Sequence, residues 1–371
     1  MIIAINAISA KKGGMLTYTL SLIDYLIKLK GNDVFHIWVP LNLPRNSSEK
    51  VVLHKTKATY YSPLKRLLYD QIILRNEVKK IKADVLFSSA GMGLIFSPCK
   101  QLLLIRNNIY YNKYYRKEIY SKFGPIQKIN YLLHMYLIYF SARRTDALIF
   151  PSFTMKKSFL SFYVSGFPNA YVNYYGISNN KFNNHKNTIL NTNTSIKLLY
   201  ISKYYPHKRP EIILRAYEIL KEKKYNVKIR MTMEFYELKN YLDSSDLITI
   251  TGNKNITLCA ISPDENQELY FKNDIFIFPS LCESFGFPLI EAMASEIPII
   301  AADTEINREI CGKAALYFEP DNEFELVENI LLINNNMRTR NGLIQESVKR
   351  INKYLVGKHI NKIIDICKEM I

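Results

Sequence analysis

Residues 278–303, FPSLCESFGFPLIEAMASEIPIIAAD, combine a loop that carries a glutamate with apolar segments on either side. The short apolar runs 275–279 and 297–301 are typical of buried strands. Residues 288–294 between them predict a helix, because Pro288 suits a first helical turn. A strand, a loop, a helix and a second strand in succession form the repeating unit of a parallel sheet covered by helices.

The same alternation recurs along all 371 residues, a length that suits two domains. In the first half we predict strands at 2–8, 34–39, 85–87, 102–105 and 147–151, and helices at 16–29, 64–81 and from 154. In the second half we predict strands at 196–201, 227–232, 247–251, 275–279 and 297–301, and helices at 209–221, 236–242, 264–272, 288–294 and beyond 324.

The predicted class is therefore α/β, with two doubly wound parallel-sheet domains. The polar, Asn-rich segment 182–195 is the predicted linker, so we place the domains at 1–185 and 186–355. We expect residues 356–371 to form a helix that packs back on the first domain. Ligands of such sheets bind beyond the carboxyl ends of the strands, so we expect the active site in a cleft between the domains.

The positive charge of the chain is concentrated in its first half. Residues 1–185 contain 26 Lys and Arg against 8 Asp and Glu, whereas residues 186–371 contain 24 against 25. A one-sided charge of this kind attracts polyanions, and we interpret it as a surface for anionic lipids. General solubility is the simpler alternative.

Five scattered cysteines without a CxxC pair favour a reducing compartment over a disulfide framework or a zinc site. The N-terminal run MIIAINAIS lacks a preceding basic region and predicts a strand, not a signal peptide. No uninterrupted apolar run reaches the length of a membrane span. We therefore expect a cytoplasmic protein that associates peripherally with the inner face of the membrane.

Three groups of residues suit the binding of a phosphorylated sugar. Glu283 in the loop and Glu291 on the helix can accept hydrogen bonds from hydroxyls on two parts of one ligand. Lys203 and Lys208 follow the predicted strand 196–201 and can neutralise a diphosphate, although solvated surface lysines are an equally simple interpretation. Gly13-Gly14 follows the first strand, where glycines let backbone N–H groups approach a phosphate.

These motifs resemble family 4 (group 1) retaining glycosyltransferases. The pair Glu283 and Glu291 matches the family's E-x7-E signature. Further matches in the right order are Gly13-Gly14, PSFTMKKSF (151–159), Tyr175-Gly176-Ile177, YISKYYPHKRP (200–210) and ALYFEPDNEFEL (315–326). The resemblance spans the whole chain and is most specific in the second half.

The resemblance implies a GT-B fold and transfer with retention of configuration, without a metal or another cofactor. It implies that Glu283 contacts the transferred sugar, Glu291 the ribose, and Lys208 the phosphate. Backbone amides of Ser284, Phe285 and Gly286 would face the sugar and diphosphate. Lys203 stands where the family often has arginine, and Thr251-Gly252 would lie near the base.

One segment departs from the family pattern. Many members have a histidine near the start of a first-domain loop, but here the comparable stretch is LLLIRNNIYYN (102–112). Part of the family resembles this chain in having Arg-Asn there, so we place Arg106 and Asn107 at the active site. No residue stands out as the catalytic base.

Residues 109–144 alternate tyrosines with basic residues, and apolar positions recur at helical spacing from 126 to 140. Tyrosine and lysine suit a membrane interface. We expect contact mainly through the tyrosine-rich loop, and for the helix we leave open whether its apolar face packs on the sheet or meets lipid.

We therefore predict transfer of a hexose, with mannose favoured, from a GDP- or UDP-sugar to a glycan or lipid-linked acceptor in surface-polysaccharide synthesis. A nucleotide-sugar epimerase of the same fold and a non-enzymatic polyanion-binding protein are the alternatives. No nucleic-acid partner is expected, because no recognisable nucleic-acid motif is present.

Overall fold

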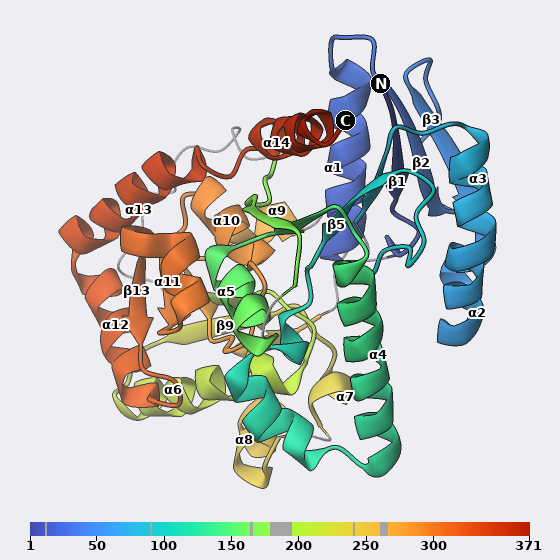
Figure 1. The fold of residues 1–371 in the computed structure, drawn as a ribbon. Coiled ribbons are helices and arrows are strands. Elements are labelled where there is room, and N and C mark those ends of the chain that lie inside the picture. Colours follow the sequence, from blue (N-terminus) through green and yellow to red (C-terminus); the bar gives the residue numbers. More distant parts are fainter. Residues whose placement is uncertain (12, 90, 164–165, 179–194, 240–241, 260–265) are drawn as a thin grey trace. The chain divides into compact units, whose positions relative to one another are not determined.

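The computed structural model describes residues 1–11, 13–89, 91–163, 166–178, 195–239, 242–259 and 266–371. These residues form two compact units (Figure 1). The first unit contains residues 1–176 and 356–371, and the second contains residues 177–355. The predicted linker, 182–195, and the predicted boundary at residue 185 lie outside the described residues, apart from Ser195.

The first unit is built on a parallel sheet of seven strands in the order β3-β2-β1-β4-β5-β6-β7. Its strands are β1 (Ile2–Asn6), β2 (Val34–Pro40), β3 (Val51–Thr56), β4 (Val85–Ser88), β5 (Lys100–Leu104), β6 (Ala147–Phe150) and β7 (Asn169–Val172). Its longer helices are α1 (Gly14–Lys28), α4 (Pro125–Arg143), α5 (Phe153–Phe162) and α14 (Val356–Glu369). Every residue of β4 and β6 is buried, as expected for a sheet covered on both faces.

A continuous helical segment joins β3 to β4. It consists of α2 (Pro63–Leu68), the π-helix η2 (Tyr69–Leu74) and α3 (Arg75–Lys80). Leu74 and Val78 pack on the sheet with Trp38 and Leu86. Shorter 3-10 and π turns are η1 (Lys57–Tyr60), η3 (Asn108–Tyr110), η4 (Tyr115–Ile119) and η5 (Tyr120–Lys122).

The last helix, α14, belongs to the first unit, and it lies beside α1 (Figure 1). The hydroxyl of Tyr25 on α1 donates to the side chain of Asn361 on α14 at 3.1 Å. His359 on the same helix is buried against Tyr18. Residues from opposite ends of the chain therefore share one core.

The second unit has a parallel sheet of six strands in the order β10-β9-β8-β11-β12-β13. The strands are β8 (Ile196–Tyr200), β9 (Val227–Met231), β10 (Ile256–Leu258), β11 (Ile275–Phe278), β12 (Ile299–Ala302) and β13 (Ala315–Phe318). The helices are η7 (Pro206–Lys208), α6 (Glu211–Glu222), α7 (Phe235–Leu238), α8 (Ser244–Ile250), α9 (Asn266–Lys272), α10 (Phe287–Ala294), α11 (Glu305–Cys311), η8 (Gly312–Ala314), α12 (Glu323–Asn335) and α13 (Met337–Ile351).

One predicted strand, 247–251, is wrong. These residues belong to α8, which begins after Asp243, whose carboxylate accepts from the Asp246 backbone N–H at 2.9 Å. The apolar, β-branched run LITI favours a strand, but this N-cap outweighs that preference. The strand is β10, which starts at Ile256 and pairs with β9.

Candidate active site

The candidate site lies at the carboxyl edge of the second sheet, where β8 and β11 are paired neighbours. The loop after β8 leads into η7, and the loop after β11 carries Glu283. The backbone N–H of Leu281 donates to the carbonyl of His207 at 2.9 Å. The two loops are therefore joined through their backbones.

Lys208 and Glu283 form an ion pair between these two loops. Their side chains are only 16% and 13% exposed. The Lys208 ammonium also lies 5.9 Å from the centre of the Phe278 ring. Shielding from water strengthens the attraction between the two charges, so the structure brings together two residues that the sequence predicted separately.

Two buried side chains that the sequence analysis missed support these loops. His207 is buried beside Lys208, and burial, followed by the charge of Lys208, lowers the pKa of its imidazole to about 4. The buried Asn307 amide donates to the carbonyls of Ser280 at 3.2 Å and Ala302 at 2.9 Å. Asn307 therefore ties the end of β11 to the end of β12, a role for which the sequence gives no signal.

Gly286 sets the turn into α10. Its φ of 96° is in the left-handed region, and a Cβ there would lie 3.1 Å from the Cδ1 atom of Leu289. The loop of Ser284 and Phe285 leads into this helix. Gly286 offers no side chain to cap it, and the Gly286 carbonyl accepts from the N–H of Leu289 at 3.0 Å. The Phe285 ring is buried and packs 5.7 Å from the ring of Tyr354, which anchors that loop.

Glu291 lies on α10 and is held by a tyrosine from α9. The hydroxyl of Tyr270 donates to Oε2 of Glu291 at 3.0 Å. Burial, and then the charge of Glu291, raises the pKa of Tyr270 well above its usual value, so its hydroxyl stays protonated. Tyr270 fixes the Glu291 carboxylate, and nothing in the sequence pattern singled it out.

Lys203 lies on the loop between β8 and η7, with an exposed side chain. Its carbonyl accepts the hydroxyl of Ser202 at 2.8 Å. Arg209, directly after Lys208, has a φ of 51° and forms ion pairs with Glu211 and Asp321. These ion pairs fix the backbone at the end of η7 and so help to position Lys208.

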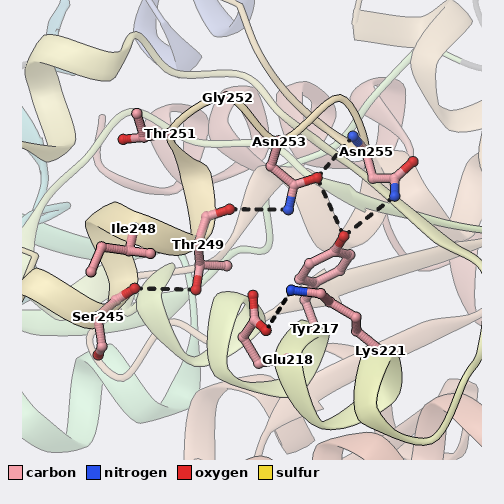
Figure 2. Close-up of a pocket in the computed structure, with 10 residues that line it drawn as sticks. All are labelled: Tyr217, Glu218, Lys221, Ser245, Ile248, Thr249, Thr251, Gly252, Asn253 and Asn255. Atoms are coloured by element: carbon pink, nitrogen blue, oxygen red, sulfur yellow. Dashed lines mark hydrogen bonds and ion pairs between the residues drawn. The ribbon is translucent and has the colours of Figure 1, made fainter.

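Thr251 and Gly252 do not lie with Lys208 and Glu283. They precede β10, so they lie at the amino edge of the second sheet, whereas the ion pair lies at its carboxyl edge. The misplaced strand explains this error, because a strand at 247–251 would have put both residues at the carboxyl edge. In the structure they line a pocket of about 550 Å³ between α6 and α8 (Figure 2).

In the first unit, Gly13 and Gly14 form the start of α1, as predicted. Gly13 has a φ of 62° and a ψ of −155°, a conformation essentially confined to glycine. A Cβ at Gly13 would meet nothing within 4 Å among the described residues, and Gly13 itself has no side chain to cap the helix. A glycine at this position therefore begins α1 without a side chain beside the first N–H groups of the helix.

Arg106 follows β5, at the carboxyl edge of the first sheet. Its guanidinium donates to the carbonyl of Ser89 at 3.4 Å, and its aliphatic chain lies against Gly91. Burial lowers the pKa of Arg106, while the nearby Tyr175 and Tyr18 favour its charged form. Asn107 is exposed, and its side chain accepts from the N–H of Ile109 at 3.5 Å at the start of η3.

His359 on α14 contacts residues near the same edge of the first sheet. The sequence did not predict a role for it. Its Nδ1 lies 2.9 Å from the Tyr174 carbonyl and its Nε2 lies 3.1 Å from the Tyr18 hydroxyl. The carbonyl can only accept, so Nδ1 carries the proton and Nε2 accepts from Tyr18. Burial lowers the pKa of His359 to about 4, which leaves the ring neutral at neutral pH.

The tyrosine-rich loop is predicted to contact a membrane, but several of its tyrosines are buried inside the first unit. Tyr110, Tyr111 and Tyr115 are buried, and Tyr131 on α4 donates to the carbonyl of Ile109 at 2.8 Å. The rings of Tyr110 and Tyr131 are 4.9 Å apart. The aromatic residues of this loop therefore form a core beneath α4.

Within the described ranges, no helix has the length and apolar character needed to cross a membrane. The same part of the chain contains no cluster of three or more His, Cys, Asp or Glu side chains that could hold a metal ion. Metal independence remains a prediction.

A comparison with known protein families finds a match for the part of the chain that contains the Lys208–Glu283 ion pair. Residues 181–350 match the model described as "Glycosyl transferases group 1". This part of the chain is therefore similar to the group 1 glycosyl transferases. The predicted recognition is confirmed, and Lys208, Glu283 and Glu291 all lie within the matched residues.

Several named glycosyltransferases align with part of the chain. The capsular polysaccharide biosynthesis glycosyltransferase CapM of Staphylococcus aureus is 32% identical over 36% of this chain and 36% of its own length. The O-antigen chain mannosyltransferase RfbU of Salmonella typhimurium is 27% identical over 53% of each chain. The aligned segments thus span between about a third and a half of these relatives.

Solved structures confirm the predicted α/β GT-B fold class. HepE of Anabaena, solved in complex with UDP-glucose, has a TM-score of 0.72 and covers 100% of both chains at 14% identity. At this identity the likeness shows the fold alone.

Proposed function

We propose that the protein is a glycosyltransferase that moves a hexose from a nucleotide-diphosphate sugar to a glycan or lipid-linked acceptor in cell-surface polysaccharide synthesis. The observation that carries this proposal is the Lys208–Glu283 ion pair at the carboxyl edge of the second sheet. It lies within the group 1 glycosyl transferase match, next to the helix that carries Glu291. The names of CapM and RfbU support a role in capsule or O-antigen assembly.

The residues of the second unit suggest how the donor is bound. Lys208, with Lys203 on the same loop, would neutralise the diphosphate as it leaves. The positive end of the α10 dipole would add to this attraction, and the backbone amides of Ser284, Phe285 and Gly286 would face the sugar and diphosphate. Electrostatic stabilisation of the leaving group is then the main contribution of the protein to the rate.

The two glutamates would accept hydrogen bonds from hydroxyl groups. Glu283 would bind the transferred sugar, and Glu291, oriented by Tyr270, would bind the ribose. A ligand that carries both a phosphate and a sugar can replace the Lys208–Glu283 ion pair with two new interactions. A phosphate alone breaks this ion pair and offers Glu283 nothing in exchange.

We further propose that transfer retains the anomeric configuration and needs neither a metal nor another cofactor. The donor is a GDP- or UDP-linked hexose, and mannose is favoured because RfbU is named a mannosyltransferase. Activity should persist in the presence of EDTA. Loss of activity with EDTA and its recovery with a divalent ion would contradict this part of the proposal.

The first unit would bind the acceptor, with Gly13, Gly14, Arg106 and Asn107 at its carboxyl edge. The excess of 26 Lys and Arg over 8 Asp and Glu in residues 1–185 supports attraction to an anionic membrane. We therefore propose that the protein works at the inner face of the cytoplasmic membrane, where lipid-linked acceptors are presented.

Thermal-shift measurements with GDP, UDP, GDP-mannose and UDP-glucose test the donor site. A ligand at about 100 times its Kd stabilises the folded state by about 2.7 kcal/mol and should raise the Tm by a few degrees. We expect Glu291→Ala to remove most of this shift. Glu268→Ala, at an exposed carboxylate on the neighbouring helix α9, is the matched control and should keep the shift.

A full shift in Glu291→Ala would show that Glu291 does not hold the nucleotide. Turnover of the nucleotide sugar in the absence of any acceptor would favour the epimerase instead.

A further inference from the structure

Helix α4 presents apolar side chains on two opposite faces. Tyr131, Met135 and Ile138 lie on one face and are buried. The α4 stripe, which we define as Ile126, Ile129, Leu133, Tyr136 and Phe140, lies on the other face. Ile126 is 76% exposed and Ile129 is 64% exposed. A helix that is apolar on both sides has a second face available for an apolar neighbour besides the core it already covers.

A second exposed stripe lies on the segment between β3 and β4. The α2 stripe consists of Leu64, Leu68, Ile72 and Ile73, and Leu64 is 69% exposed. The sequence predicts a single helix over residues 64–81, whose apolar residues include Leu68, Ile72 and Ile73. The π-helical turn η2 changes the spacing, so Leu74 and Val78 point to the core while these three residues remain outside.

The two stripes lie on the same side of the first sheet. The connections from β3 to β4 and from β5 to β6 both step toward β7, so right-handed crossovers put α2–α3 and α4 on one face of the sheet. Phe96 links them, because Arg75 on α3 donates to its carbonyl at 2.8 Å and the Arg144 guanidinium lies 5.4 Å from its ring. The ring of Phe96 is itself exposed.

The charges around the stripes favour one kind of partner. Residues 105–145 contain eight Lys or Arg and a single acidic residue, Glu118. Helix α4 itself contains Lys128 and Arg143 and no Asp or Glu. An apolar face bordered by basic side chains matches the interface of an anionic bilayer, where apolar groups enter the acyl region and cations meet the phosphates.

We propose that the α4 and α2 stripes insert into the surface of an anionic phospholipid bilayer, so that apolar burial, and not charge alone, holds the first unit on the membrane. This inference rests on the proposed function only for the claim that the membrane carries the acceptor. Exposed apolar patches of this extent on a folded protein usually mark an interaction site.

Flotation of the full chain with phospholipid vesicles tests the proposal. One set of vesicles contains phosphatidylcholine alone, and the other adds phosphatidylglycerol. The wild type should bind the anionic vesicles at both low and high salt. The triple variant Ile126→Asn/Ile129→Asn/Leu133→Asn should bind them about 100-fold more weakly, because three inserted side chains are lost.

Ile248→Asn is the matched control, because Ile248 is an equally exposed isoleucine on α8 of the second unit. It should bind vesicles like the wild type. The substituted side chains are exposed, so the Tm of each variant should stay close to that of the wild type.

Three outcomes would overturn the proposal: no binding of the wild type to any vesicle, equal binding of wild type and triple variant, or a difference between them that disappears at high salt. The last would mean that charge alone attracts the protein, since salt screens exposed charges. The nucleotide-induced thermal shift of the triple variant separates this proposal from the donor site, because it should equal that of the wild type whatever the vesicles show.

Discussion

The carboxyl edges of the two sheets hold their cations in different surroundings. In the second unit, Lys208 is paired with the carboxylate of Glu283 on the neighbouring loop. In the first unit, Arg106 lies among neutral groups, namely the Ser89 carbonyl and the hydroxyls of Tyr18 and Tyr175. An anion must compete with the Glu283 carboxylate to bind Lys208. An anion that binds Arg106 has no carboxylate to displace, because the neighbouring groups are neutral.

This difference suggests that the two edges suit different ligands. The ion pair favours a ligand that brings a phosphate and hydroxyl groups together, because both partners of the pair then gain a new contact. The surroundings of Arg106 suit any anionic group on an acceptor. The carboxyl edge of the second sheet, which we call the second edge, should therefore be selective for a sugar nucleotide. The carboxyl edge of the first sheet, the first edge, should tolerate more variation in its ligand.

Lys208→Gln should have the largest effect and tests this comparison directly. Loss of a cation at the departing diphosphate should lower the rate of sugar transfer about 10²- to 10³-fold. The rate is measured with whichever sugar nucleotide raises the Tm. Lys221→Gln, at an exposed lysine on α6, is the control and should keep the wild-type rate.

Arg106→Gln provides the counterpart in the first unit. We expect it to lower the transfer rate while leaving the nucleotide-induced thermal shift at its wild-type value. The comparison fails if Arg106→Gln abolishes this shift, or if Lys208→Gln transfers sugar as fast as the wild type.

The sequence predicted the second edge well because its residues lie within short, continuous motifs. The strand β11, the loop with Glu283 and the helix α10 with Glu291 follow one another within residues 275–294. Apolar runs that alternate with helical patterns also predicted most of the strands. The strands that were not predicted, β3, β7, β10 and β13, are the edge strands of the two sheets, and each has partly exposed residues.

The first edge could not be predicted, because its contacts join distant parts of the chain. His359 and Tyr18 are 341 residues apart, and no local pattern connects them. In the segment 109–144, both the loop and the helix are rich in apolar and aromatic residues. Composition alone could not tell that Tyr110 and Tyr111 pack inside while Ile126 and Ile129 stay outside.

The pH dependence of stability probes the buried histidine of the first edge. His359 has a pKa of about 4 in the folded state, below its ordinary value of 6.5. Above pH 6.5 the ring is neutral in both states and no stability is lost. As the pH falls from 6.5 to 4, only the unfolded state takes up the proton, so the free energy of unfolding decreases, by about 2 kcal/mol at pH 5.

Urea unfolding followed by tryptophan fluorescence measures this effect, because Trp38, the single tryptophan, lies in β2 of the first unit. His359→Gln should make the decrease about 2 kcal/mol smaller at pH 5, while His207, whose pKa is also about 4, still contributes to it. His134→Gln, at an exposed histidine on α4, should leave it unchanged. Equal pH profiles for wild type and His359→Gln would mean that His359 is not buried in its neutral form.

The smallest effect concerns the glycines that begin the helices at the two edges. Gly13 and Gly286 both have positive φ angles, of 62° and 96°, which an L-residue adopts at a cost of about 1 to 2 kcal/mol. Gly286→Ala also brings a Cβ to within 3.1 Å of Leu289, whereas the Cβ of Gly13→Ala would meet nothing within 4 Å. Both variants should therefore be destabilised, and Gly286→Ala should have the lower free energy of unfolding.

Gly342 offers the control, because it lies inside α13, its φ is not positive, and a Cβ there would meet nothing within 4 Å. Gly342→Ala should raise the free energy of unfolding by up to about 1 kcal/mol, since alanine favours a helix. Calorimetry of the three variants gives the order directly. If Gly13→Ala were as stable as the wild type, the turn into α1 would not need its left-handed backbone, and the likeness between the two helix N-termini would be lost.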